Sequence, residues 1–217
     1  MSVPAALRLA APILIALVAA GCAPSRVVLT GPEGDRAERF FADLPGEVAF
    51  PVKASFSGVA EPMARDAVPF IAGVNAPSPA EEAIGVYDPL GRGVLFLSND
   101  GRRLEVSRGP AADLMGIRGV SPLPAGPLSI ARLLSGAPGY PVEGGEPARQ
   151  ADGGWSLADD RQVLYSDPGR RFLARASYRL PGMTVEVSYP DRDSPDPPRR
   201  LALSVRGAKI TLRRDEE

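Results

Sequence analysis

The chain has 217 residues, of which 44% are hydrophobic and 24% are charged, and it contains one cysteine and no histidine. Its 25 Lys and Arg residues nearly balance its 26 Asp and Glu residues, which argues against a nucleic-acid partner, because phosphates require a clearly basic surface. The lack of histidine excludes imidazole-based nucleophile systems and imidazole metal sites, and a single cysteine excludes an internal disulfide or a multi-thiolate metal site.

The N-terminal segment has the layout of a secretion signal. Arg8 precedes the apolar run Leu9–Ala19, which is shorter than the roughly 20 residues of a membrane-spanning helix. Small residues then lead to Cys22, as in a bacterial lipoprotein signal, although the position three before the cysteine holds Ala19 rather than the commoner leucine. The pattern predicts a signal peptide over residues 1–21 and acylation of Cys22; the alternative is an ordinary secretory signal with a chance cysteine.

The residue after the cysteine bears on localisation. It is Ala23 and not Asp, and an Asp there often signals retention in the inner membrane of Gram-negative bacteria. We therefore expect the periplasmic face of the outer membrane, with anchoring by the acylated Cys22. Residues 22–34 are rich in Pro and Gly, which indicates a tether, and a single domain is predicted over residues 35–217.

A helix is predicted at the start of this domain. Asp35 and Glu38 resemble a capping box. An apolar stripe follows at helical spacing, formed by Ala37, Phe40, Phe41 and Leu44. Pro45-Gly46 predicts the end of the helix.

Most of the remaining chain alternates between apolar and polar residues, which predicts strands with one buried face. The predicted strand segments are Val52–Gly58, Phe70–Val74, Ile84–Tyr87, Val94–Leu97, Leu104–Val106, Ala174–Tyr178, Val185–Tyr189, Leu201–Val205 and Ile210–Leu212. Their short spacing favours hairpins over parallel crossovers. The fold class is therefore mainly β (α+β), with one many-stranded, strongly curved antiparallel sheet around two or three helices.

The middle of the chain interrupts this alternation. Pro110–Met115 is long enough for one or two helical turns. Pro127–Ser135 predicts a better helix, because Ile130, Leu133 and Leu134 share one face and Gly136 follows as a stop signal.

No group of residues predicts catalysis. Asp191, Asp193 and Asp196 lack the glycine and distal glutamate of a calcium loop, and no glycine-rich phosphate loop occurs. Trp155 is either a core residue or part of a ligand site. We expect no catalytic residue, no metal and no cofactor.

The segment Asp88-Pro89-Leu90-Gly91 is a tight turn with an apolar residue at its tip. Turn chemistry does not favour leucine at that place. Leu90 either folds back on the sheet or projects toward a bilayer, a lipid or a partner.

The order of these features resembles the LolB family of outer-membrane lipoproteins, which receive lipoproteins from the periplasmic carrier LolA. The resemblance runs from about Asp35 to Arg213. It rests on the cysteine signal and six short segments, which are Ala54–Gly58, Tyr87–Gly91, Val94–Leu97, Leu128–Pro138, Gly154–Leu157 and Gly207–Leu212. The region Val68–Val74, followed by Pro77 and Pro79, is less aromatic than in many family members.

The resemblance implies an unclosed β-barrel with lid helices, an interior that holds acyl chains, and a loop that enters the membrane. The implied insertion loop is Pro89, Leu90 and Gly91. The residues we assign to the cavity lining are Phe56, Phe70, Phe96, Trp155 and Tyr178. Those we assign to the lid helices are Phe40, Phe41, Leu133 and Leu134.

The function expected from this resemblance is that of a non-enzymatic, monomeric acceptor of lipoprotein acyl chains, with a LolA-like carrier and the outer membrane as partners. Carrying acyl chains requires apolar burial and no proton transfer. Two alternatives stay open: an envelope assembly or structural lipoprotein without lipid cargo, and a carboxylate-based hydrolase of cell-wall sugars.

Overall fold

The computed structural model describes residues 26–44, 48–61, 66–112, 128–205 and 208–215. Within these ranges the chain forms one 13-stranded antiparallel sheet and two helices. The expectations of a mainly β fold and of one antiparallel sheet are therefore confirmed. The strand order is β1-β7-β8-β9-β10-β11-β12-β13-β2-β3-β4-β5-β6.

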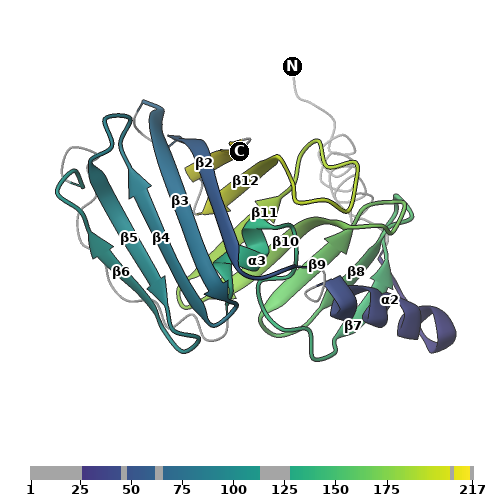
Figure 1. The fold of residues 1–217 in the computed structure, drawn as a ribbon. Coiled ribbons are helices and arrows are strands. Elements are labelled where there is room, and N and C mark those ends of the chain that lie inside the picture. The colour runs from purple at the N-terminus through teal and green to yellow at the C-terminus, as the bar shows by residue number, and fades with distance from the viewer. Residues whose placement is uncertain (1–25, 45–47, 62–65, 113–127, 206–207, 216–217) are drawn as a thin grey trace, which may run out of the picture.

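The half of the sheet that carries the site is a meander of five strands (Figure 1). These strands are β2 (Val52–Glu61), β3 (Val68–Ser78), β4 (Glu81–Tyr87), β5 (Gly93–Asn99) and β6 (Leu104–Arg108). Side chains alternate strictly in β2 and β3, so that Phe56 and Phe70 point into the core while Ser57 and Ile71 point away from it. We call the side that points away from the core the outer face.

The other half contains eight strands. They are β1 (Val27–Val28), β7 (Glu146–Arg149), β8 (Trp155–Ala158), β9 (Gln162–Ser166), β10 (Leu173–Leu180), β11 (Met183–Ser188), β12 (Arg200–Val205) and β13 (Ala208–Arg214). Pairing of β13 with β2 joins the two halves, with Leu212 opposite Gly58. β1 lies in the segment that was expected to be a tether.

The first helix, α2 (Gly31–Asp43), begins four residues before the predicted start. Pro32 lies in its first turn, where the missing N–H costs nothing and the fixed φ favours the helix. Asp35 therefore lies inside the helix and does not cap it. The predicted face is correct, because Ala37, Phe41 and Leu44 are buried.

The second helix, α3 (Ile130–Leu134), lies within the predicted Pro127–Ser135 segment. It ends as expected, since Gly136 has a φ of 82° and the Ala137 N–H donates to the Arg132 carbonyl. Pro110, Ala111 and Ala112 form a turn, and the rest of the predicted 110–115 turns lies outside the described residues.

The sheet departs from the expected strong curvature. Its edge strands β1 and β6 stand at opposite ends of the strand order, so the sheet is not closed, and it is not strongly curled. Strong curvature requires repeated bulges or kinks, whereas the register shifts at only three places: in β10 after Leu173, in β3 after Asn75, and in β4 after Val86.

The core lies between one face of the sheet and the two helices. Its members include Phe41, Phe56, Leu134, Leu164 and Tyr178, which are all in one cluster of buried residues. Among the described residues, no helix is long and apolar enough to cross a membrane.

Candidate membrane-contacting site

The turn between β4 and β5 is held by Asp88. One oxygen, Oδ1, accepts hydrogen bonds from the backbone N–H groups of Leu90 at 3.0 Å and Arg92 at 2.9 Å. The other, Oδ2, accepts from Arg92 Nε at 2.7 Å and forms an ion pair with Nη2 at 2.6 Å. Burial raises the pKa of Asp88, but the hydrogen bonds donated by Arg92 and Leu90 outweigh it and hold this pKa below its usual value. The turn is thus fixed by a carboxylate that stays ionised.

The tip of this turn carries no unpaired N–H group. The Gly91 N–H donates to the Asp88 carbonyl at 2.9 Å, Leu90 and Arg92 donate to the Asp88 carboxylate, and Pro89 has no N–H. Gly91 has a φ of 79°, a conformation that favours glycine. A loop with its donors satisfied internally can enter an apolar phase without exposing them to it.

Leu90 projects from this tip. Its exposed fraction is 77%, the highest of the large apolar side chains that the structure describes as exposed. Of the two possibilities left open by the sequence, projection is the one observed. A leucine exposed to this extent is available to an apolar partner.

The outer face beside the tip is also apolar. Register places Ile71 opposite Tyr87, and the Tyr87 and Phe96 rings meet edge to face at a centroid distance of 5.9 Å. Val59, Ile71 and Phe96 are 37%, 41% and 38% exposed. Leu90 and these three residues are four of the six large apolar side chains described as exposed, and all four come from β2, β3, β5 or the β4–β5 turn.

A hollow of about 780 Å³ crosses the same face and touches β2 to β6. On its floor Gly73 stands opposite Gly85. The Tyr87 ring covers Gly85, where a Cβ would collide with it, but a Cβ on Gly73 would meet no atom within 4 Å. Lys53 and Asn75 lie at its polar end, whereas Tyr87 and Phe96 lie toward the tip. The outer face is therefore amphipathic along the strands, with its apolar part next to Leu90.

Four of the five aromatic residues assigned to a cavity lie in one core cluster, and the fifth lies on the other face of the sheet. Phe56 and Tyr178 are only 1% exposed and, with Phe70 and Trp155, belong to the packed core. Phe96 points to the opposite side and lines the outer hollow. The Tyr178 hydroxyl accepts a hydrogen bond from the Gly139 N–H at 3.1 Å, and burial raises its pKa above the ordinary tyrosine value, which fits a structural position.

The residues assigned to lid helices lie in the two helices. Phe41, Leu133 and Leu134 are buried, and Phe40 contacts the Trp155 ring at 5.8 Å between centroids.

Cys22 lies outside the described residues. The described ranges contain no group of three or more Asp, Glu or Cys side chains placed to hold a metal ion.

The sequence did not single out Asp88 as a structural residue of the tip, nor Val59 and Ile71 as its neighbours. An Asp before a Pro-x-Gly turn is a signal that could have identified Asp88. Val59 and Ile71 are apolar residues at positions where the alternation of their strands places polar residues, and this mismatch could have identified them as part of an exposed apolar surface.

Comparison with known proteins gives distant similarities of fold among solved structures. No protein-family model matches the chain, and no curated protein matches it in sequence. Among solved structures, the chain is similar to a LolA superfamily protein from Nitrosomonas europaea, with a TM-score of 0.45 and 12% identity over 84% of this chain and 91% of that one.

Proposed function

We propose that this chain is an outer-membrane-anchored lipoprotein that accepts acylated lipoproteins from a periplasmic carrier and passes their acyl chains into the bilayer through the 89–91 tip. The proposal has no catalytic step. Moving intact acyl chains from one apolar environment to another needs an apolar contact surface and a route into the membrane. No covalent bond is made or broken.

The observation that carries this proposal is the exposure of Leu90 on a turn whose N–H groups are all bonded within the chain. The lipoprotein signal at Cys22 and the LolB-like order of segments support it. A short apolar tip on a rigid hairpin can enter the acyl region while the sheet stays outside.

The test is a transfer assay in which a carrier loaded with a labelled lipoprotein is mixed with liposomes that hold this protein. Leu90→Glu should reduce delivery by about tenfold or more, because a carboxylate in the acyl region costs several times the apolar gain of leucine. Leu90→Met keeps an apolar tip and should deliver normally. Unchanged delivery by Leu90→Glu would reject the proposal.

A second candidate is an envelope assembly lipoprotein without lipid cargo. The burial of Phe56 and Tyr178 favours it, because both side chains are 1% exposed within the core cluster. Mass spectrometry of the soluble Cys22→Ala protein separates the two: co-purified phospholipid or acylated peptide supports cargo binding, and its absence together with failed transfer supports the second candidate.

A further inference from the structure

A second depression on the outer face lies directly beside the insertion turn. Its volume is about 440 Å³. We call it the Arg213 trough. Its lining comes from four strands and the β4–β5 turn, and the residues that matter here are Val59, Pro69, Ile71, Pro89, Arg200 and Arg213.

One end of the trough is apolar. Val59 stands opposite Pro69 in the β2–β3 pairing, and Pro89 belongs to the turn that presents Leu90. Ile71 and Val59 are both more than a third exposed. This end is therefore continuous with the apolar tip.

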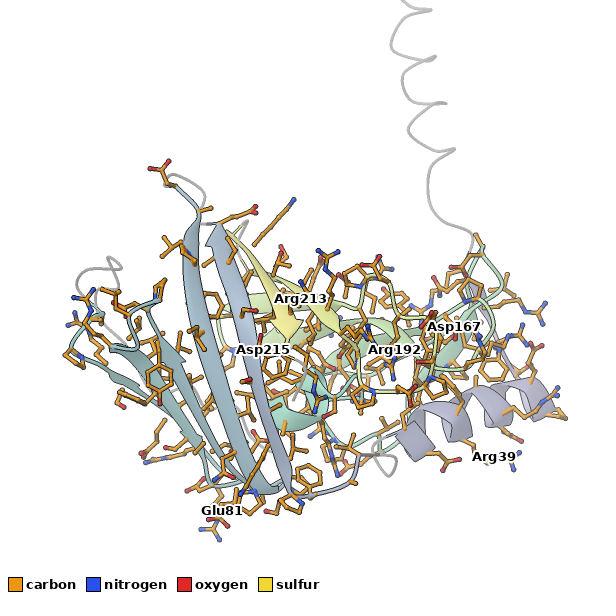
Figure 2. The ribbon with its side chains drawn as sticks, turned by 45° about the horizontal axis from the view of Figure 1, so that its top comes forward. Arg39, Glu81, Asp167, Arg192, Arg213 and Asp215 are labelled. Atoms are coloured by element: carbon orange, nitrogen blue, oxygen red, sulfur yellow. The ribbon has the colours of Figure 1, made fainter. Side chains whose placement is uncertain are left out.

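The other end is cationic. β13 lies beside β2 (Figure 2), and Arg213 stands opposite Ser57 across this pairing and opposite Arg200 across the β12–β13 pairing. Among the described residues, none forms an ion pair with Arg213. Arg200 pairs with Asp191 at 3.1 Å, but both side chains are more than half exposed, so the pair is weak and exchangeable.

Acidic side chains do not line the trough. Two carboxylates lie behind lining residues: Asp191 pairs with Arg200, and Asp215 accepts a hydrogen bond from Ser57 Oγ at 2.8 Å. Two guanidinium groups beside an apolar strip complement a ligand that joins an anionic oxygen cluster to an acyl chain.

We propose that the Arg213 trough docks an anionic phospholipid of the bilayer, with its phosphate at Arg200 and Arg213 and its acyl chain along Val59 and Ile71 toward Leu90. This inference rests on the proposed membrane function and adds to it a lipid class and an orientation. Headgroup binding fixes which side of the sheet meets the membrane, so that Leu90 points into the acyl region.

The experiment uses the mature chain with Cys22→Ala, so that no anchor contributes, in co-sedimentation with vesicles. Binding should be clear with phosphatidylethanolamine–phosphatidylglycerol vesicles and weak with phosphatidylcholine vesicles. Arg200→Gln with Arg213→Gln should weaken binding to the anionic vesicles by about tenfold. The matched control, Arg102→Gln with Arg103→Gln in the β5–β6 turn, removes the same charge and should bind as the parent does.

A second pair of variants tests the apolar end. Ile71→Glu should lower binding to anionic vesicles, whereas Thr184→Glu, an exposed substitution on β11, should lower it far less. Equal loss in both charge-removal pairs would overturn the proposal, because it would show a general effect of net charge. Binding of inorganic phosphate by the soluble chain, with no stronger binding to anionic vesicles than to phosphatidylcholine vesicles, would also overturn it, because the trough would then be a site for the free anion.

The outcome is separable from that of the proposed function. If the arginine variants bind anionic vesicles normally while Leu90→Glu still abolishes delivery, the trough proposal fails and the transfer function stands. If the arginine variants lose vesicle binding while Leu90→Glu delivers normally, the trough proposal stands and the insertion role fails.

Discussion

At the scale of single residues, Asp88 determines the shape of the tip. Its carboxylate accepts both backbone N–H groups that flank Gly91 and neutralises Arg92. Without it, two donors and a guanidinium would lose their partners in the turn that we propose enters an apolar phase. The cost of exposing such groups to hydrocarbon is several kcal/mol each.

We predict that Asp88→Ala impairs insertion of the tip while the fold persists. In a Cys22→Ala background, a thiol placed by Leu90→Cys is unique and can carry an environment-sensitive fluorophore. The blue shift of this probe on vesicles should be lost in Asp88→Ala and kept in Asp100→Ala. Asp100 is the matched control, because its Oδ1 accepts from the N–H groups of Arg102 and Arg103 in the next hairpin. Equal shifts in both variants would show that Asp88 does not position the tip.

Asp167 gives a pH-dependent prediction. Its carboxylate is buried in the β9–β10 turn and accepts from the N–H groups of Arg171 at 2.5 Å, Phe172 at 3.0 Å and Gly169 at 3.0 Å. Burial raises the pKa of Asp167, but these bonds outweigh it and lower the pKa below the usual 3.8. A group whose pKa is lower in the folded state stabilises at pH values above its unfolded pKa, and this stabilisation is lost as the pH falls through the folded pKa.

Asp167→Asn should therefore reduce the free energy of unfolding by about 1–3 kcal/mol at neutral pH. The difference from the parent should shrink below about pH 4, where the parent carboxyl begins to protonate. Urea titrations across this pH range measure it. A difference that stays constant down to acid pH would contradict the assignment.

At the scale of elements, Glu82 connects β4 to α3. It is 3% exposed and accepts from Ser129 Oγ at 2.5 Å and from the N–H groups of Ile130 at 2.9 Å and Ala131 at 3.0 Å. The first-turn donors of this short helix are therefore satisfied by a strand of the sheet. A five-residue helix is not stable alone, so its position depends on this contact and on the burial of its apolar face.

Glu82→Ala should lower the free energy of unfolding by about 2–3 kcal/mol, because it leaves the buried Ser129 hydroxyl and the N–H groups of Ile130 and Ala131 without this acceptor. Its neighbour Glu81 is exposed, and Glu81→Ala should change stability by less than about 0.5 kcal/mol. Chemical denaturation of both variants measures the difference. Similar values would show that the cap does not stabilise the fold.

At the scale of the whole molecule, the proposed function requires the amphipathic outer face and an acylated Cys22 to act on the same membrane. Each acyl CH₂ group buried contributes about 0.8 kcal/mol, so several chains give durable anchoring that one exposed leucine cannot supply. Under the proposed function, the tip and trough supply transient contact and orientation, and the acyl anchor supplies retention.

Cys22→Ala should consequently convert the protein from a membrane-retained to a soluble periplasmic form. After an alkaline wash, the parent should remain in the membrane pellet and the variant in the supernatant. Retention of the variant would contradict anchoring by acylation, because the tip and trough alone are expected to hold reversibly.

Alternation along the chain was sufficient to predict the nine strands whose two faces differ. It missed β1, β7, β8 and β9. β1 has only two residues and β8 only four, which is too short to reveal a period of two, and β7 contains Pro147, which weakens a strand pattern. In β9 the polar residues Gln162 and Ser166 lie on the buried face, so its apolar residues do not mark that face.

The candidate site was predictable only in part. Leu90 was found because leucine contradicts turn chemistry, but its exposure depends on whether another element covers it, which no local pattern states. The cavity lining was assigned by residue type, and four of its five aromatics lie in the packed core. Aromatic residues fill cores and line ligand sites for the same reason, the burial of apolar area, so type alone does not separate the two.

The sequence by itself determined the β class, the helix faces and the absence of imidazole and multi-thiolate chemistry, because composition and local periodicity act over neighbouring residues. Only the tertiary structure decided that Val59, Ile71, Phe96 and Leu90 share one face and that Arg200 and Arg213 stand beside it. These residues lie on different strands, and their meeting depends on strand order and register, which are set by the packing of the whole sheet.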